Sequence, residues 1–183
     1  MIKKIAIVGA VAVALAQSVQ AVPITGNIGF AGTAVLNTAN AATASTVVGW
    51  INTHVETVSG DFSVFTALNH AVLFHNPWSF NSGPISSFWV VDGFTFSLSA
   101  SARFSSPGAQ LLDVLLSGTV SGHGFNATAF EGTFQVANPP SNAGLAQFSA
   151  HLSFNSIPDG GTTVLLLGAA LSGLALFRRK LAA

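Results

Sequence analysis

The sequence contains no cysteine and no tyrosine, and only 7% of its residues are charged. Without thiols the chain has no disulfide, no thiolate nucleophile and no cysteine-ligated zinc or iron–sulfur centre. Apolar residues make up 50% of the chain and include 15 phenylalanines, which is enough for a core that folds without cross-links. We therefore predict a domain that is stabilised by its core and solubilised mainly by uncharged polar side chains.

Basic residues are nearly absent from the middle of the chain. Arg103 is the only Lys or Arg between residues 22 and 156. The acids in the same range are Glu56, Asp61, Asp92, Asp113 and Glu131. One cation against five acids gives this part a net charge of −4, although the whole chain is neutral. Binding to phosphates needs a basic surface, so this composition excludes a nucleic-acid partner.

The first 21 residues have the pattern of a secretory signal peptide. Lys3 and Lys4 precede an apolar stretch over residues 5–16, and small residues follow up to Ala21. We predict cleavage between Ala21 and Val22, with the Sec translocon and signal peptidase as partners. The alternative is an uncleaved anchor, for which the apolar stretch is short.

Residues 162–177 carry no charge and are followed at once by Arg178, Arg179 and Lys180. As a helix this stretch would be about 24 Å long, slightly less than the ~30 Å hydrocarbon core of a bilayer. The basic cluster would stay in the cytoplasm, with the preceding domain outside. We predict a single transmembrane helix over 162–177; the alternative is a buried helix in a soluble domain.

A short motif precedes this stretch: Ile157, Pro158, Asp159, Gly160 and Gly161. The motif, the apolar helix and the basic tail together resemble the PEP-CTERM sorting signal of Gram-negative bacteria. The five-residue motif is most similar to the VPDSG variant, which has Val where this chain has Ile157 and Ser where it has Gly160. The resemblance implies processing by an exosortase, a membrane-embedded cysteine protease or transpeptidase, near Pro158 to Gly161.

The same resemblance implies a route and a destination. The chain would be held in the inner membrane transiently through residues 162–177. It would then reach the cell surface or the extracellular matrix, where such passengers are linked with exopolysaccharide and biofilm. We therefore divide the chain into a signal peptide (1–21), a passenger domain (22–156) and a C-terminal sorting signal (157–183).

Alternation of apolar and polar residues dominates the passenger and predicts β-strands. We expect long strands over residues 24–36, 46–58, 94–104, 111–120, 129–136 and 146–154, and shorter ones over 61–68 and 71–74. Turn residues separate them, as in Ser121-Gly122-His123-Gly124. The pattern predicts an all-β fold, an antiparallel β-sandwich, with a β-barrel as the alternative.

Four stretches of the passenger resemble the β-rich passengers of other PEP-CTERM proteins. They are Gly60-Asp61-Phe62, Phe88-Trp89, Phe94-Thr95-Phe96 and Leu116-Ser117-Gly118-Thr119. The resemblance implies no activity, and we predict a structural or exopolysaccharide-associated protein with no catalytic residue and no cofactor.

Histidines are the main candidates for chemistry, at positions 54, 70, 75, 123 and 151. His70 and His75, with Asp61 or Asp92, could form a two-histidine, one-carboxylate metal set, which makes a metal-dependent hydrolase the second alternative function. No HExxH motif or Gly-x-Ser-x-Gly elbow supports catalysis. We therefore interpret these histidines as surface or strand-edge residues and predict no metal site.

Trp78 is the candidate for contact with a glycan. It lies in the stretch His75-Asn76-Pro77-Trp78, which looks like a loop, where an aromatic side chain is less bound to the core. An exposed indole face can stack on a sugar, so the first alternative function is a carbohydrate-binding module. The competing interpretation is that Trp78, like Trp50 and Trp89, belongs to the core.

Overall fold

The computed structural model describes residues 22–104, 111–137 and 144–154, of which about two thirds are β-strand and very few are helix. The predicted signal peptide, the sorting motif, the apolar stretch 162–177 and the basic tail lie outside the described residues. The elements are β1 (Asn27–Leu36), β2 (Thr46–Val58), α2 (Phe62–Phe65), β3 (Leu73–Phe74), β4 (Trp78–Ser79), β5 (Ile85–Val91), β6 (Phe94–Arg103), β7 (Leu111–Gly122), β8 (Phe125–Ala137) and β9 (Leu145–Phe154).

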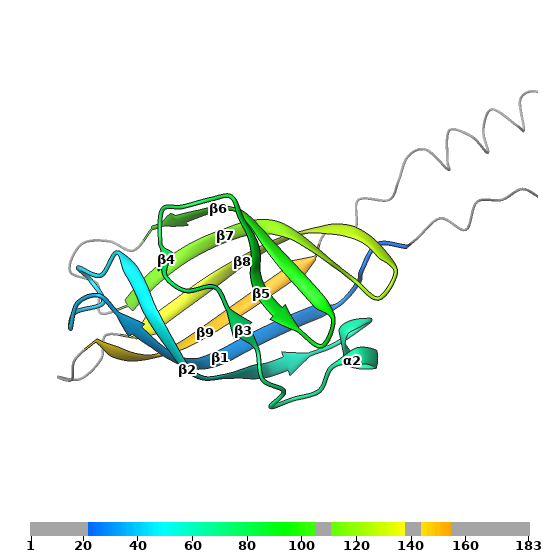
Figure 1. Cartoon of the computed structure of the whole chain (residues 1–183), viewed down its shortest axis with the longest axis horizontal. Helices are drawn as coiled ribbons and strands as arrows, with labels where there is room; N and C mark the ends of the chain where they lie inside the picture. Colours follow the sequence, from blue (N-terminus) through cyan, green and yellow to red (C-terminus); the bar gives the residue numbers. More distant parts are fainter. Residues whose placement is uncertain (1–21, 105–110, 138–143, 155–183) are drawn as a thin grey trace, which may run out of the picture.

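All nine strands belong to one antiparallel sheet, in the order β3-β5-β6-β7-β8-β9-β1-β2-β4. The sheet curls into a half-barrel, with β3, β4 and β5 in front of β7, β8, β9 and β1 (Figure 1). The prediction of an all-β antiparallel fold is confirmed. The prediction of a sandwich of two separate sheets is wrong, because hydrogen bonding continues without a break from β5 round to β2.

Residues 69–84 cross the open side of the half-barrel, and we call them the crossing segment. Its backbone bonds first to β2, where Val55 N donates to His70 O at 2.9 Å. It then bonds to β5, where His75 N donates to Phe88 O at 2.8 Å, and returns to β2 through β4. The segment therefore joins the two free sides of the sheet, which is why strands close in sequence, β3 and β4, stand at opposite ends of the strand order.

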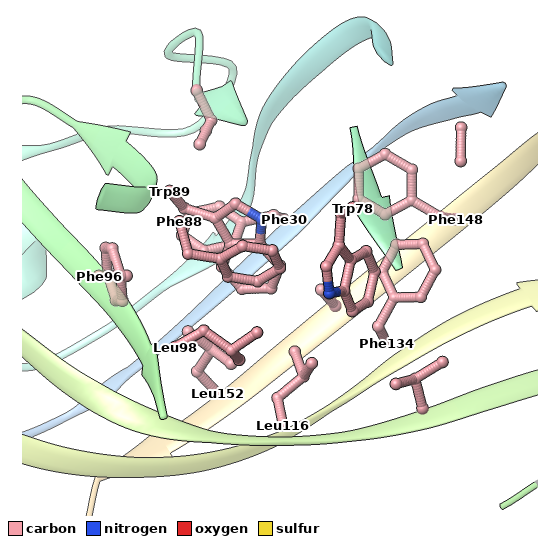
Figure 2. Close-up of a cluster of buried hydrophobic side chains, with 14 of the residues drawn as sticks. Phe30, Trp78, Phe88, Trp89, Phe96, Leu98, Leu116, Phe134, Phe148 and Leu152 are labelled. Carbon is pink, nitrogen blue, oxygen red and sulfur yellow. The ribbon is translucent and has the colours of Figure 1, made fainter. Parts of the chain in front are cut away.

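The alternating residues of the long strands point into one aromatic core, as the sequence pattern predicts. Its largest fully buried side chains include Trp78, Trp89, Phe30, Phe88 and Phe134. Figure 2 shows Trp78 and Trp89 facing rings from the opposite layer. Phe30 meets Trp89 edge-on at 5.1 Å between ring centroids, and Trp78 meets Phe134 at 5.0 Å. Such perpendicular contacts are the favoured geometry for packed rings.

Two local predictions differ from the structure. Residues 61–68 were expected to form a strand, but they contain the single helical turn α2 followed by a loop. Phe62 is the only side chain of α2 that is buried, so the turn rests on the core through one anchor. The strand β5 was not expected from the sequence, because its first residues, Ile85 to Ser87, lack clean alternation and its pairing with β6 is interrupted by a bulge.

Candidate functional site

Both ends of the described chain lie at one end of the half-barrel, beside α2 (Figure 1). The hairpin turns β5–β6 and β7–β8 lie at the same end. We call it the α2 end and define it by residues 22–26, 61–70, 92–93, 122–126 and 154. The opposite end carries the β1–β2 connection, residues 37–45, with Arg103 and Phe104, and we call it the Arg103 end.

Asp92 is the central polar residue of the α2 end. It forms a two-residue hairpin turn with Gly93, and both residues have positive φ, 44° and 84°. An Asp-Gly pair between apolar strands is a strong signal for such a turn. The Asp92 carboxylate accepts hydrogen bonds from the Thr66 hydroxyl and from His70 Nδ1, the latter at 2.6 Å. One carboxylate oxygen therefore ties the β5–β6 turn to the loop after α2.

These hydrogen bonds hold the pKa of Asp92 below its usual range. The largest cause is the bond from the Thr66 hydroxyl, partly opposed by burial, and His70 contributes through its bond and its charge. Hydrogen bonds to a carboxylate favour the ionised form, which gives the direction of the shift. Asp92 is therefore ionised at neutral pH and acts as an acceptor only.

His123 fastens the second hairpin turn to the first. Its Nε2 lies 2.6 Å from the backbone oxygen of Asp92, so Nε2 carries the proton of this bond. The ring also stacks on Phe65 of α2, with 3.9 Å between centroids and 17° between planes. Two hairpin turns and α2 thus form one connected surface.

Asp61 anchors the start of α2 to the incoming chain. Its Oδ2 accepts hydrogen bonds from the backbone N and the hydroxyl of Thr25, at 2.7 and 2.9 Å. Val22 lies nearby: its carbonyl accepts a hydrogen bond from Asn126 N at 3.1 Å, and its surface is 63% exposed. The other predicted signal-cleavage residue, Ala21, lies outside the described residues.

The two-histidine, one-carboxylate set considered as an alternative does not form among the described residues. His70 does meet Asp92, but His75 lies further along the crossing segment with its backbone bonded to Phe88, and Asp61 is bonded to Thr25. Within the described ranges, no group of three or more His, Asp or Glu side chains is placed to hold a metal ion. Of this alternative set, the structure brings together only His70 and Asp92.

The predicted glycan contact at Trp78 is also corrected. Trp78 is 0% exposed and packs edge-on against Phe80, Phe88 and Phe134. The loop-like sequence around it forms the short strand β4, which pairs with β2 at Val47 and turns the indole inward (Figure 2). Trp89 is also fully buried, and Trp50 packs against the core while its Nε1 donates to His75 O at 3.0 Å.

The sequence indicates the two hairpin turns of the α2 end, but it does not indicate how these turns and α2 come together. Asp92-Gly93 and the turn at His123 are visible as hairpin turns from their residue types. The Thr66–Asp92 bond joins residues 26 apart in sequence, and no periodicity reports such a pair. The only feature of the sequence that indicates this hydrogen bond is the polar residue Thr66, which directly follows the mainly apolar residues of α2.

In its described parts, the structure contains no helix that is both long and apolar enough to cross a membrane. The predicted processing residues Ile157, Pro158, Asp159, Gly160 and Gly161, and the basic residues Arg178, Arg179 and Lys180, lie beyond Phe154, outside the described part of the chain.

Comparison with known families gives one match. Residues 156–181 match the family model described as the VPDSG-CTERM motif. No curated protein and no solved structure matches the chain. The match covers the predicted sorting signal and confirms the suspected resemblance. Residues 156–181 are thus a PEP-CTERM-like sorting motif, which indicates an exported protein that an exosortase processes.

Proposed function

We propose that this protein is a non-enzymatic structural component of the cell surface or extracellular matrix of a Gram-negative bacterium. It is exported by Sec and loses residues 1–21. Residues 162–177 then hold it in the inner membrane until an exosortase processes it near Pro158 to Gly161. The observation that carries the proposal is the VPDSG-CTERM motif at residues 156–181, which begins two residues after β9 ends at Phe154.

The described residues support a structural role. The interior is filled by aromatic side chains, and the carboxyl groups at the α2 end serve the fold: Asp92 joins two turns, and Asp61 anchors α2. The His70–Asp92 pair resembles part of a catalytic relay. However, no hydrogen bond to a hydroxyl is found on the second ring nitrogen of His70 among the described residues. We therefore assign this pair to the fold rather than to catalysis.

Intact-mass spectrometry tests the processing step. The full chain is expressed in cells with an active exosortase and in matched cells without it. We expect the mature protein to begin at Val22 and to end between Pro158 and Gly161 in the first cells only. Asp159→Ala should block the trimming, whereas Asn155→Ala, just outside the matched motif, serves as the control. Recovery of mature protein that still carries residues 165–180 from exosortase-active cells would overturn the proposal.

Association with exopolysaccharide is the second part of the proposal. The strands present outward polar residues such as Thr119 and Ser121 of β7, which give the outer face hydroxyl groups. Co-sedimentation of the processed protein with isolated exopolysaccharide tests this association. Trp78→Phe should leave the sedimented fraction unchanged because Trp78 is buried. Absence of the protein from the polysaccharide pellet would leave only the structural role.

A further inference from the structure

The α2 end exposes three large apolar side chains within five residues. Val64 is 73% exposed, Phe65 is 40% exposed and Leu68 is 54% exposed. They are held in place rather than free, because Phe62 beneath them packs on Phe94 and Phe154 at 4.8 and 4.7 Å. A group of exposed apolar residues on a fixed support is typical of an interaction surface.

The position of the last described strand limits which part of the domain can approach a membrane. β9 ends at Phe154, at the α2 end, and the apolar stretch begins at Thr162. Eight residue steps reach at most about 28 Å when fully extended. β8 alone has 13 residues, and at ~3.3 Å per residue it extends about 40 Å from the α2 end towards the Arg103 end. The connection is too short for the Arg103 end to face the membrane, so the α2 end is the nearer one.

We propose that the α2 end rests on the lipid surface of the membrane that holds residues 162–177, with Val64, Phe65 and Leu68 as its contact residues. The inference rests on the proposed function, since it needs residues 162–177 to be inserted. The partner is the headgroup and upper acyl region of a bilayer, which accepts aromatic and aliphatic side chains at shallow depth.

The charged residues of the α2 end indicate that its contact with the membrane is made by apolar side chains. The α2 end has the carboxylates Asp61 and Asp92 and no Lys or Arg among its described residues. The one Arg of the described ranges, Arg103, is at the opposite end. Attraction to anionic lipids is therefore absent, and added salt, which screens charge, should not release the surface from the bilayer.

Because the chain has no cysteine, a single fluorescent label can be placed at any position. The chain without its signal peptide but before exosortase processing, residues 22–183, is reconstituted into vesicles of phosphatidylethanolamine and phosphatidylglycerol. It is labelled through Val64→Cys, Phe104→Cys or Leu166→Cys, and quenched by a lipid with a spin label near the headgroup. Phe104 is the matched control, because it is 52% exposed and lies at the Arg103 end.

We expect quenching at position 64 to be several-fold stronger than at position 104, and unchanged in high salt. Quenching at 166 but not at 64 would overturn this inference and leave the membrane anchor of the proposed function intact. Quenching at 64 but not at 166 would retain the lipid-contact surface and reject the anchor. No quenching at either position would reject both, and equal quenching at 64 and 104 would reject the orientation. Unchanged thermal unfolding of each labelled protein confirms that the fold is intact.

Discussion

Charged side chains hold loops and turns in place at both ends of the half-barrel, and the charges at the two ends differ in sign. At the Arg103 end, the guanidinium donates hydrogen bonds to the carbonyls of Ala44, Ala42 and Ala41, at 2.7, 2.5 and 3.4 Å. At the α2 end, the Asp92 carboxylate accepts from Thr66 and His70. Arginine stays charged at every accessible pH, whereas a carboxylate does not. The hydrogen bonds from Arg103 therefore do not depend on pH, whereas those to Asp92 do.

The largest effect is expected from Arg103→Ala. The substitution removes hydrogen bonds from a charged donor to three carbonyls and releases the β1–β2 connection, which should lower the free energy of unfolding by about 3 kcal/mol. Urea unfolding followed by tryptophan fluorescence measures the change. Arg103→Lys keeps the charge but not the planar fork, so its loss should be intermediate. Wild-type stability in Arg103→Ala would show that the Arg103 end does not need this fastening.

Asp92→Asn should have a smaller effect, about 1.5 kcal/mol at pH 7, because the carboxylate accepts its bonds at a partly exposed turn. The pKa of Asp92 is lowered in the folded protein, so its contribution is complete above the unfolded value of about 3.9 and is lost as pH falls through the lowered folded value. The difference between wild type and Asp92→Asn should therefore shrink below about pH 4.

Unfolding curves at several pH values compare the two ends directly. The difference between wild type and Arg103→Ala should persist in acid, while the Asp92→Asn difference should not. If the stability differences of Arg103→Ala and Asp92→Asn respond to pH in the same way, the contrast between the pH-independent bonds of Arg103 and the pH-dependent bonds of Asp92 is wrong.

The smallest effect is expected from His70→Gln. The His70 side chain is half exposed, and the Thr66 bond to Asp92 remains, so the free energy of unfolding should fall by only about 0.5 kcal/mol. Chemical denaturation at pH 7 measures it, with His75→Gln as the control on the same segment. A loss as large as that of Asp92→Asn would mean that His70, rather than Thr66, is the main partner of the carboxylate.

The long strands could be predicted from the sequence, because each buries one face and alternation reports that directly. The predicted range 46–58 coincides with β2, and the predicted strand at 94–104 differs from β6 by one residue. The turn at His123 was equally visible from its flanking glycines. The long strands and this turn are determined by residues that are close together in the sequence, so the residue types alone are sufficient to predict them.

The path of the crossing segment could not be predicted beyond the short strand expected at 71–74, which overlaps β3, because its hydrogen-bond partners lie on two separated strands. Its prolines and glycine indicated a loop around Trp78, so the sequence left open whether this side chain was exposed to a glycan or buried in the core. Tertiary pairing of β4 with β2 overrides that local signal and buries the indole. The Asp92 site has the same origin, since its parts meet only once the crossing segment is in place.

The crossing segment has a further consequence for a protein that has few charges to keep its copies apart. A sheet with free margins invites other chains to add strands to it and to polymerise. Here residues 69–84 bond to β2 on one margin and to β5 on the other. The molecule's own backbone thus covers part of each margin, which shortens the sheet edge that is open to strand addition by other chains.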